Sequence, residues 1–253
     1  ANTMIQNKHL MPRPPYSMAL GDLDGDGDND LVIGGYISAA RIFWNENGQF
    51  IPDQNALYFL EDSERGAAVQ IVDMDNDADL DILTSTSERL LLHRNVKTRE
   101  FAMENINVPA SDGFGTAGGI ATGDLNGDGY PDLAVQTKIS NVIAFNLQEG
   151  NRWLKLNFQN ALSNRQGIGT KIWVTLEGGR TIYREYWGSN GAYRSLSCAG
   201  LIIGVAKSPE VDIKITWPSG ISRSYTNIPT NKEITLHEKF VVPSSILWTS
   251  EKH

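Results

Sequence analysis

The chain of 253 residues has a single cysteine, Cys198, so no disulfide can form within it. It has only four histidines, His9, His93, His237 and His253, and no two of them have the spacing of metal ligands, which argues against a zinc site. No apolar run approaches ~18 residues, so the sequence predicts no membrane span. What remains is a chain with 40% hydrophobic residues, enough to fill a folded core.

Familiar catalytic motifs are also missing. The sequence has no Gly-x-Ser-x-Gly, no phosphate-binding glycine loop and no dinucleotide fingerprint. Cys198 lies in an apolar segment, which favours a packed thiol over a nucleophile. His93 follows three leucines and is interpreted as a strand residue. Glu185 and Glu210 remain candidates for acid–base chemistry if they face a cleft. This inventory favours a binding protein over an enzyme.

Charge is distributed unequally along the chain. Residues 1–150 have 23 Asp and Glu against 9 Lys and Arg, a net of −14, whereas residues 151–253 have 7 against 13, a net of +6. This shift predicts two domains, 1–150 and 151–253. The basic residues of the second half alternate along expected strands and do not cluster, so nucleic acid is not an expected partner.

Three acidic loops recur at 22–30, 73–81 and 124–132, and their first residues are 51 apart. Each loop has carboxylate or amide oxygens at places 1, 3, 5 and 9, which is how a short loop surrounds one hard cation. The pattern predicts three Ca²⁺ sites, with side-chain ligands at these places and a main-chain carbonyl at place 7. The predicted ligands are Asp22, Asp24, Asp26, Asp28 and Asp30; Asp73, Asp75, Asp77, Asp79 and Asp81; and Asp124, Asn126, Asp128, Tyr130 and Asp132.

The loops differ in ways that predict unequal sites. The second loop has Asn76 and Ala78 where the first has Gly25 and Gly27. If place 6 requires a positive φ, Ala78 is penalised by about 1–2 kcal/mol. The third loop has Asn126 in place of a carboxylate and should bind calcium less tightly than the first.

An apolar run follows each loop, so the loops should join β-strands, and a third strand in each unit ends at Asn45, Asn95 or Asn146. Units of several short strands with one loop signature are typical of β-propeller blades. The segments 21–27 and 123–129, with Phe114-Gly115 ahead of the third loop, resemble the FG-GAP or VCBS repeat of integrin-type propellers. The resemblance covers residues ~17–148.

The second half alternates like a set of strands, with a hairpin turn at 177–180. Its motifs resemble the ASPIC/UnbV domain of cartilage acidic protein and its bacterial relatives. They are Asn151-Arg-Trp-Leu, Asn164-Arg-Gln-Gly-Ile-Gly169, Arg184-Glu185, Trp217-Pro-Ser-Gly220 and Asn231. Two segments depart from the family pattern, Ser195-Leu-Ser and Leu201-Ile-Ile-Gly-Val. The expected fold is all-β, a partial propeller of three calcium-loop blades followed by a β-sandwich.

The resemblance implies a secreted calcium-stabilised module, extracellular or periplasmic, that binds a protein or glycan partner. The alternative is an enzyme or an accessory factor of a biosynthetic pathway, as in the UnbV relatives. Aromatic residues of the second half suit contacts with sugars or proteins: Trp173, Tyr183, Tyr186, Trp187, Tyr193 and Trp217.

Three blades alone would leave two apolar blade faces open. We therefore expect the propeller to be completed by another chain, by a second copy, or by an N-terminal part cleaved from the same precursor.

Overall fold

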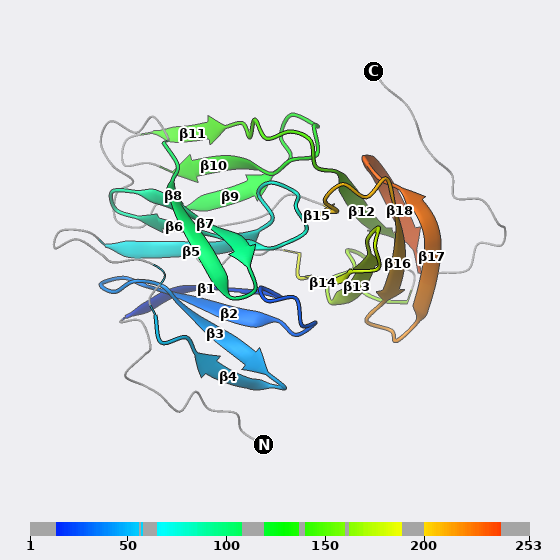
Figure 1. The fold of residues 1–253 in the computed structure, drawn as a ribbon, viewed down its shortest axis with the longest axis horizontal. Coiled ribbons are helices and arrows are strands. Elements are labelled where there is room, and N and C mark those ends of the chain that lie inside the picture. Colours follow the sequence, from blue (N-terminus) through cyan, green and yellow to red (C-terminus); the bar gives the residue numbers. More distant parts are fainter. Residues whose placement is uncertain are drawn as a thin grey trace.

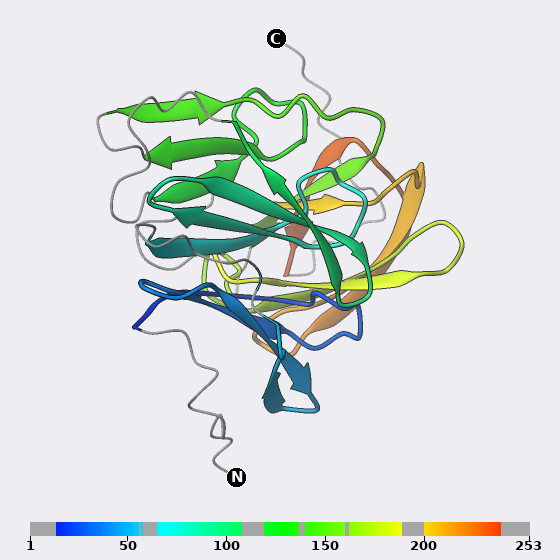
Figure 2. The ribbon, with the colours of Figure 1, turned by 60° about the vertical axis from the view of Figure 1, so that its left-hand side comes forward.

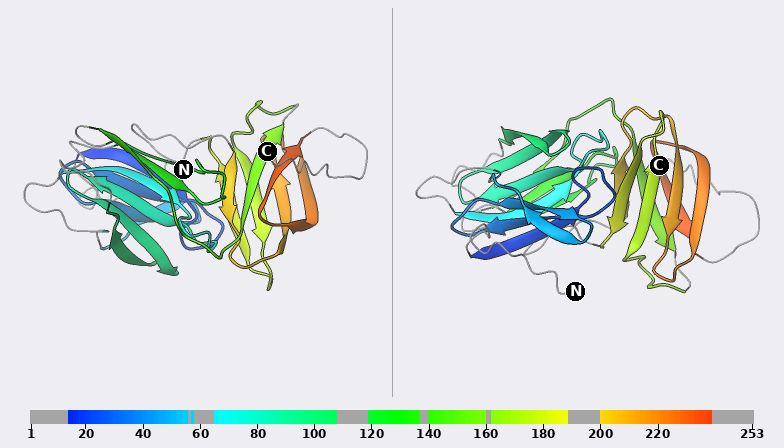
Figure 3. Two further views of the ribbon diagram at one scale, coloured as in Figure 1. Left: turned by 90° about the horizontal axis from the view of Figure 1, so that it is seen from above. Right: turned by 60° about the horizontal axis from the view of Figure 1, so that its bottom comes forward.

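The computed structural model describes residues 14–55, 57, 65–107, 119–136, 140–159, 162–188 and 200–238. Cys198, Tyr193 and the Phe114-Gly115 pair fall outside them. Every regular element in the described ranges is a β-strand, which confirms the predicted fold class. Figures 1 and 3 show the strands in two adjacent groups, β1–β11 and β12–β18. Within the described residues, no helix is long and apolar enough to cross a membrane.

The first group forms three antiparallel sheets, one for each repeat. The first sheet contains β1 (Pro15–Gly21), β2 (Asp30–Gly35), β3 (Arg41–Glu46) and β4 (Gln49–Pro52). The second contains β5 (Gly66–Val72), β6 (Asp81–Thr86), β7 (Leu90–Lys97) and β8 (Glu100–Asn105). The third contains β9 (Ile120–Gly123), β10 (Asp132–Gln136) and β11 (Asn141–Ala144).

These sheets are the blades of a partial propeller, because their first strands pack side by side. β5 packs against β1 and β2, and β9 packs against β5. The first strands of neighbouring blades also form hydrogen bonds with each other. Ser17 Oγ accepts a hydrogen bond from Val69 N at 3.0 Å, and Gln70 Nε2 donates to Thr122 Oγ1 at 2.8 Å. A separate apolar cluster lies in each of the two spaces between blades.

The second group forms a β-sandwich of two sheets. Strand order is β15-β12-β18 in one sheet and β14-β13-β16-β17 in the other. Alternation along β16 buries Val211, Ile213 and Ile215 in the core between the sheets. The predicted hairpin is confirmed, because β13 and β14 pair around a turn in which Gly178 and Gly179 have φ of 88° and 89°. The strands are β12 (Trp153–Gln159), β13 (Thr170–Thr175), β14 (Thr181–Tyr186), β15 (Leu201–Gly204), β16 (Glu210–Thr216), β17 (Ser222–Pro229) and β18 (Lys232–His237).

Candidate metal loops

Each acidic loop joins the first and second strands of a blade, as the apolar runs predict. The aspartate at place 9 closes the loop. Asp30 Oδ2 accepts a hydrogen bond from Leu23 N at 2.9 Å, and its Oδ1 accepts one from Asn45 N at 2.8 Å. The same pair of bonds occurs in the other loops, from Met74 N and Asn95 N to Asp81 and from Leu125 N and Asn146 N to Asp132.

Two of the loops gather three carboxylates into a cluster with the dimensions of a metal site. Asp22, Asp24 and Asp30 each offer one oxygen, and these oxygens lie within 4.8 Å of one another; the second cluster is Asp73, Asp75 and Asp81. Calcium–oxygen distances are about 2.4 Å, so two ligands of one ion lie at most ~4.8 Å apart. The donor set and its spacing therefore fit Ca²⁺.

The carboxylate at place 5 of each loop accepts a hydrogen bond from the main-chain N–H at place 7 of the same loop. In the first two loops, Asp26 Oδ1 accepts from Asp28 N and Asp77 Oδ1 accepts from Asp79 N, both at 2.9 Å. In the third loop, Asp128 Oδ1 accepts from Tyr130 N at 2.8 Å, while Asp128 Oδ2 accepts from the amide of Asn126, also at 2.8 Å. The third loop thus holds an amide where the others hold a third carboxylate.

Burial makes the clustered carboxylates costly to ionise without a cation. It raises the pKa of Asp22 to about 6 and that of Asp30 to about 7, from an ordinary 3.8. In the second loop, burial raises the pKa of Asp73 well above its usual range and that of Asp81 to about 7. A bound divalent cation would supply the charge that offsets this loss of hydration.

The backbone confirms the expectation of positive φ at place 6, alanine included. Ala78 has φ 80°, against 95° for Gly27 and 87° for Gly129. Asn76 also has a positive φ, of 57°. The second loop therefore holds the same left-handed positions as the other two without glycine.

The strand-end asparagines have a role that the sequence marked by position but did not explain. Asn95 Nδ2 donates to Leu80 O of its own blade at 3.2 Å and to Leu23 O of the first loop at 2.7 Å. Asn146 Nδ2 likewise donates to Pro131 O at 3.1 Å and to Met74 O of the second loop at 2.7 Å. Each of these side chains connects its own loop to the loop of the preceding blade. Their regular recurrence 22 or 23 residues after each loop start was the available signal.

The loops face the sandwich, which the sequence did not predict. The second loop is the most enclosed, because the Ala78 side chain lies in the sandwich core cluster. Its backbone is held by Ala206 N on Asn76 O at 2.9 Å and by Asn151 Nδ2 on Asp75 O at 2.8 Å. Further contacts reach the other loops, from Asn29 Nδ2 to Glu185 Oε2 at 2.9 Å and from Tyr130 Oη to Asn151 O at 2.8 Å.

A buried arginine of the sandwich lies at the centre of this contact. Arg184, on β14, is 8% exposed and donates from Nη2 to Ala78 O at 3.0 Å. Burial lowers its pKa, while the carboxylates of Asp73 and Asp22 favour its charged form. Arg184 therefore places a fixed positive charge near two of the three loops. Glu185, one of the two candidate acid–base residues, bonds to Tyr183 Oη at 2.9 Å and to Asn29.

The comparisons with known proteins match this arrangement. Residues 22–84 and 75–135 match the model of the FG-GAP-like repeat, and residues 160–241 match that of ASPIC and UnbV. The chain combines FG-GAP-like repeats with an ASPIC and UnbV domain. The FG-GAP-like matches contain the whole of all three loops, and the ASPIC and UnbV match contains Arg184.

The chain is also similar to cartilage acidic protein 1 of Xenopus tropicalis. The two are 25% identical over 228 residues, which cover 80% of this chain and 33% of the relative. The chain therefore spans about a third of the length of that relative.

Proposed function

We propose that this chain is a calcium-stabilised extracellular module that binds a protein or glycan partner. It consists of a repeat domain, 1–150, and a sandwich domain, 151–253. The observation that carries the proposal is the pair of buried three-carboxylate clusters in the FG-GAP-like loops. Loops 22–30 and 73–81 each hold one Ca²⁺, and loop 124–132 holds a third more weakly because Asn126 replaces a carboxylate.

The same loops support an extracellular or periplasmic location. Extracellular calcium modules work at dissociation constants of about 10⁻⁴–10⁻³ M, in the range of calcium outside cells. The similarity to cartilage acidic protein 1 supports an interaction role. The second loop also contacts the sandwich, so calcium bound in this loop would stabilise the contact between the two domains.

Thermal unfolding with saturating calcium and with a chelator tests the proposal. Calcium at ~100 times its dissociation constant stabilises a single site by about 2.7 kcal/mol, and each 1 kcal/mol shifts the melting temperature of a domain of this size by roughly 2–4 °C. We expect calcium to raise the melting temperature by at least about 5–10 °C, which is the effect of one occupied site. Asp81→Asn should reduce this rise, whereas the control Glu88→Gln, in the turn between β6 and β7, should not. An equal melting temperature in calcium and in chelator would refute calcium binding.

A further inference from the structure

The third blade lacks the outer strand that the first two have. β4 pairs with β3, and β8 pairs with β7, each as the fourth strand of its sheet. β11 holds the place of β3 and β7, but across the described ranges it pairs only with β10. In Figures 1 and 2, β11 lies at the margin of the repeat domain. Among the described strands, none pairs with its outer edge, and such an edge is a template for another strand.

The chain's own candidate for this place is engaged elsewhere. β4 begins at Gln49 and β8 at Glu100, 51 residues later, so a third outer strand would begin at Asn151. That segment enters β12, which pairs with β15 on one side and with β18 on the other. Arg152 stands where the earlier repeats have phenylalanine, and its N donates to Ala206 O at 2.6 Å within the sandwich. Within the described residues, no strand therefore completes the third blade.

The first two blades show what such a strand contributes. Each outer strand places a phenylalanine opposite the strand-end asparagine, Phe50 opposite Asn45 and Phe101 opposite Asn95. Phe101 packs against the apolar cluster between the first and second blades. The corresponding asparagine of the third blade is Asn146, so an outer strand there would direct a side chain to the space between the second and third blades.

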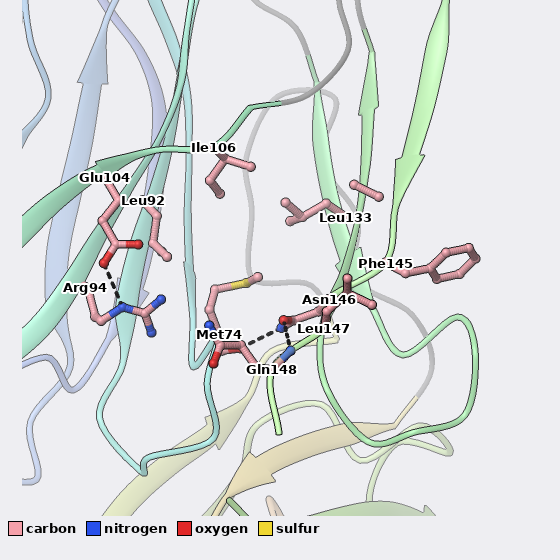
Figure 4. Close-up of a pocket in the computed structure, with 11 residues that line it drawn as sticks. Met74, Leu92, Arg94, Glu104, Ile106, Leu133, Phe145, Asn146, Leu147 and Gln148 are labelled. Carbon is pink, nitrogen blue, oxygen red and sulfur yellow. Dashed lines mark hydrogen bonds and ion pairs between the residues drawn. The ribbon is translucent and has the colours of Figure 1, made fainter. Parts of the chain in front are cut away.

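A cavity of about 310 Å³ lies in that space (Figure 4). An apolar cavity of about 150 Å³ in another protein holds benzene, so this one is large enough for an aromatic ring. Phe145 points away from the other labelled side chains in Figure 4, so it does not fill the space. The apolar lining comes from the cluster between these two blades, namely Met74, Leu92, Ile106, Leu133 and Ala144.

We propose that β11 and this cavity accept an extended strand from a protein partner. The strand pairs antiparallel with β11 and inserts an aromatic side chain opposite Asn146, as Phe101 of β8 does in the second blade. Main-chain hydrogen bonds along the edge supply affinity, and the cavity selects the aromatic residue. This inference rests on the proposed binding function and names the class of partner, a polypeptide with an aromatic residue in an extended segment.

The outer strand of the second blade supplies the probe. A synthetic peptide with the sequence of residues 97–106 is titrated into the ¹⁵N-labelled chain at saturating calcium, and the amide resonances of Ile143 and Phe145, whose N–H groups lie on the side of the strand away from β10, are followed. The matched control peptide carries Phe101→Ala. We expect the parent peptide to shift both resonances and the control to bind at least tenfold more weakly, which corresponds to ~1.4 kcal/mol. Equal binding of the two peptides, or unshifted β11 amides, would overturn the proposal.

Two variants of the chain separate the cavity from the strand edge. Ala144→Phe fills the cavity and should abolish peptide binding, whereas Ile143→Phe adds the same ring to the opposite face of β11 and should bind within about twofold of the parent. If Ala144→Phe has a lower melting temperature than the parent, Ala144→Leu replaces it as the variant that fills the cavity. Self-association of the pure chain that Ala144→Phe abolishes would identify a second copy as the occupant and overturn a separate partner. The calcium melting experiment uses no peptide, so the two proposals fail independently.

Discussion

Ala78 shows how one side chain serves two domains. Its left-handed backbone costs about 1–2 kcal/mol in any residue other than glycine. Its methyl group is buried in the sandwich core, however, and a buried methyl contributes about 0.8 kcal/mol. At the same place in the first loop, a Cβ on Gly27 would meet no atom within 4 Å. At Gly129, in contrast, a Cβ would lie 1.9 Å from the Trp153 ring of the sandwich, so the second loop is the one of the three in which a methyl group fits against a neighbour.

Replacing Ala78 with glycine should change stability by less than about 1 kcal/mol. The relieved strain is offset by the lost methyl contact and by the greater chain entropy of glycine, about 0.5–1 kcal/mol. Urea unfolding at saturating calcium measures the difference. A stabilisation above about 1 kcal/mol would show that the methyl contact does not offset the relieved strain.

Burial of His93 should make the folded protein less stable at acidic pH. His93 lies on β7, as its interpretation as a strand residue predicts. Its Nε2 atom lies 3.0 Å from Thr84 Oγ1. Burial lowers its pKa from 6.5 to about 4. Between pH 6.5 and 4, the His93 imidazole is protonated in the unfolded chain and neutral in the folded chain. Stability is therefore lost as pH falls from 6.5 to 4, by at most about 3 kcal/mol.

The variant His93→Asn keeps a polar side chain without a proton to bind in this range. We expect the unfolding free energy of the parent to fall more steeply than that of the variant between pH 6.5 and 4.5, in calcium. Parallel curves would mean that His93 is protonated in the folded state. The comparison with the variant isolates His93 from the carboxylates that titrate in the same range.

At the scale of elements, the strand-end asparagines bind neighbouring blades together. Asn95→Ala removes two hydrogen bonds and leaves Leu23 O and Leu80 O without the donor, which should cost about 1–3 kcal/mol. Asn45→Ala is the matched control, because its amide donates within its own blade, to Asn29 O. Denaturant unfolding in calcium should show the larger loss for Asn95→Ala. Equal losses would place the effect within the blade rather than between blades.

The repeat allowed most of the elements of the first half to be predicted. The spacing of 51 residues and the apolar runs gave the strands on both sides of each loop, and the alternating oxygens gave the clusters at Asp22 and Asp73. The open edge of β11 was not predicted, because Asn151-Arg-Trp-Leu alternates like any strand. Which sheet such a segment joins is decided by β15 and β18, whose sequences lie far along the chain.

For the whole molecule, the unpredicted feature is the position of the sandwich on the metal loops. Arg184 and Ala78 are 106 residues apart, and no local pattern links a sandwich arginine to a loop carbonyl. Gly204 is equally necessary, because a Cβ there would lie 2.4 Å from Asn76 Cα. Contacts of this kind depend on the fit between two finished surfaces. Periodicity within either half does not encode them.

Arg184→Met tests the link between this contact and calcium. The arginine is buried beside Asp22 and Asp73, so its loss leaves these carboxylates without a cation in metal-free protein and should cost about 3–5 kcal/mol. With calcium bound the loss should be smaller, because the ion supplies the missing charge. The rise in melting temperature caused by calcium should therefore be larger in the variant than in the parent.

The control for this prediction is Arg180→Met. Arg180 pairs with Asp79 of the same loop on the surface, where an ion pair contributes at most about 1 kcal/mol. Arg180→Met should leave the calcium-induced rise in melting temperature unchanged. An identical calcium response in Arg184→Met and the parent would show that Arg184 does not compensate the loop charge.

The parallel pairing of β12 with β18 gives the sandwich a mechanical property. These are the first and last of its described strands, and they are aligned from Leu154 opposite Lys232 to Gln159 opposite His237. Tension applied to the two ends of the domain pulls the strands in opposite directions along their length. Their hydrogen bonds are then loaded together in shear and cannot open one at a time, as in the unzipping of a hairpin. A pulling force must therefore break the whole ladder at once before the sandwich can extend.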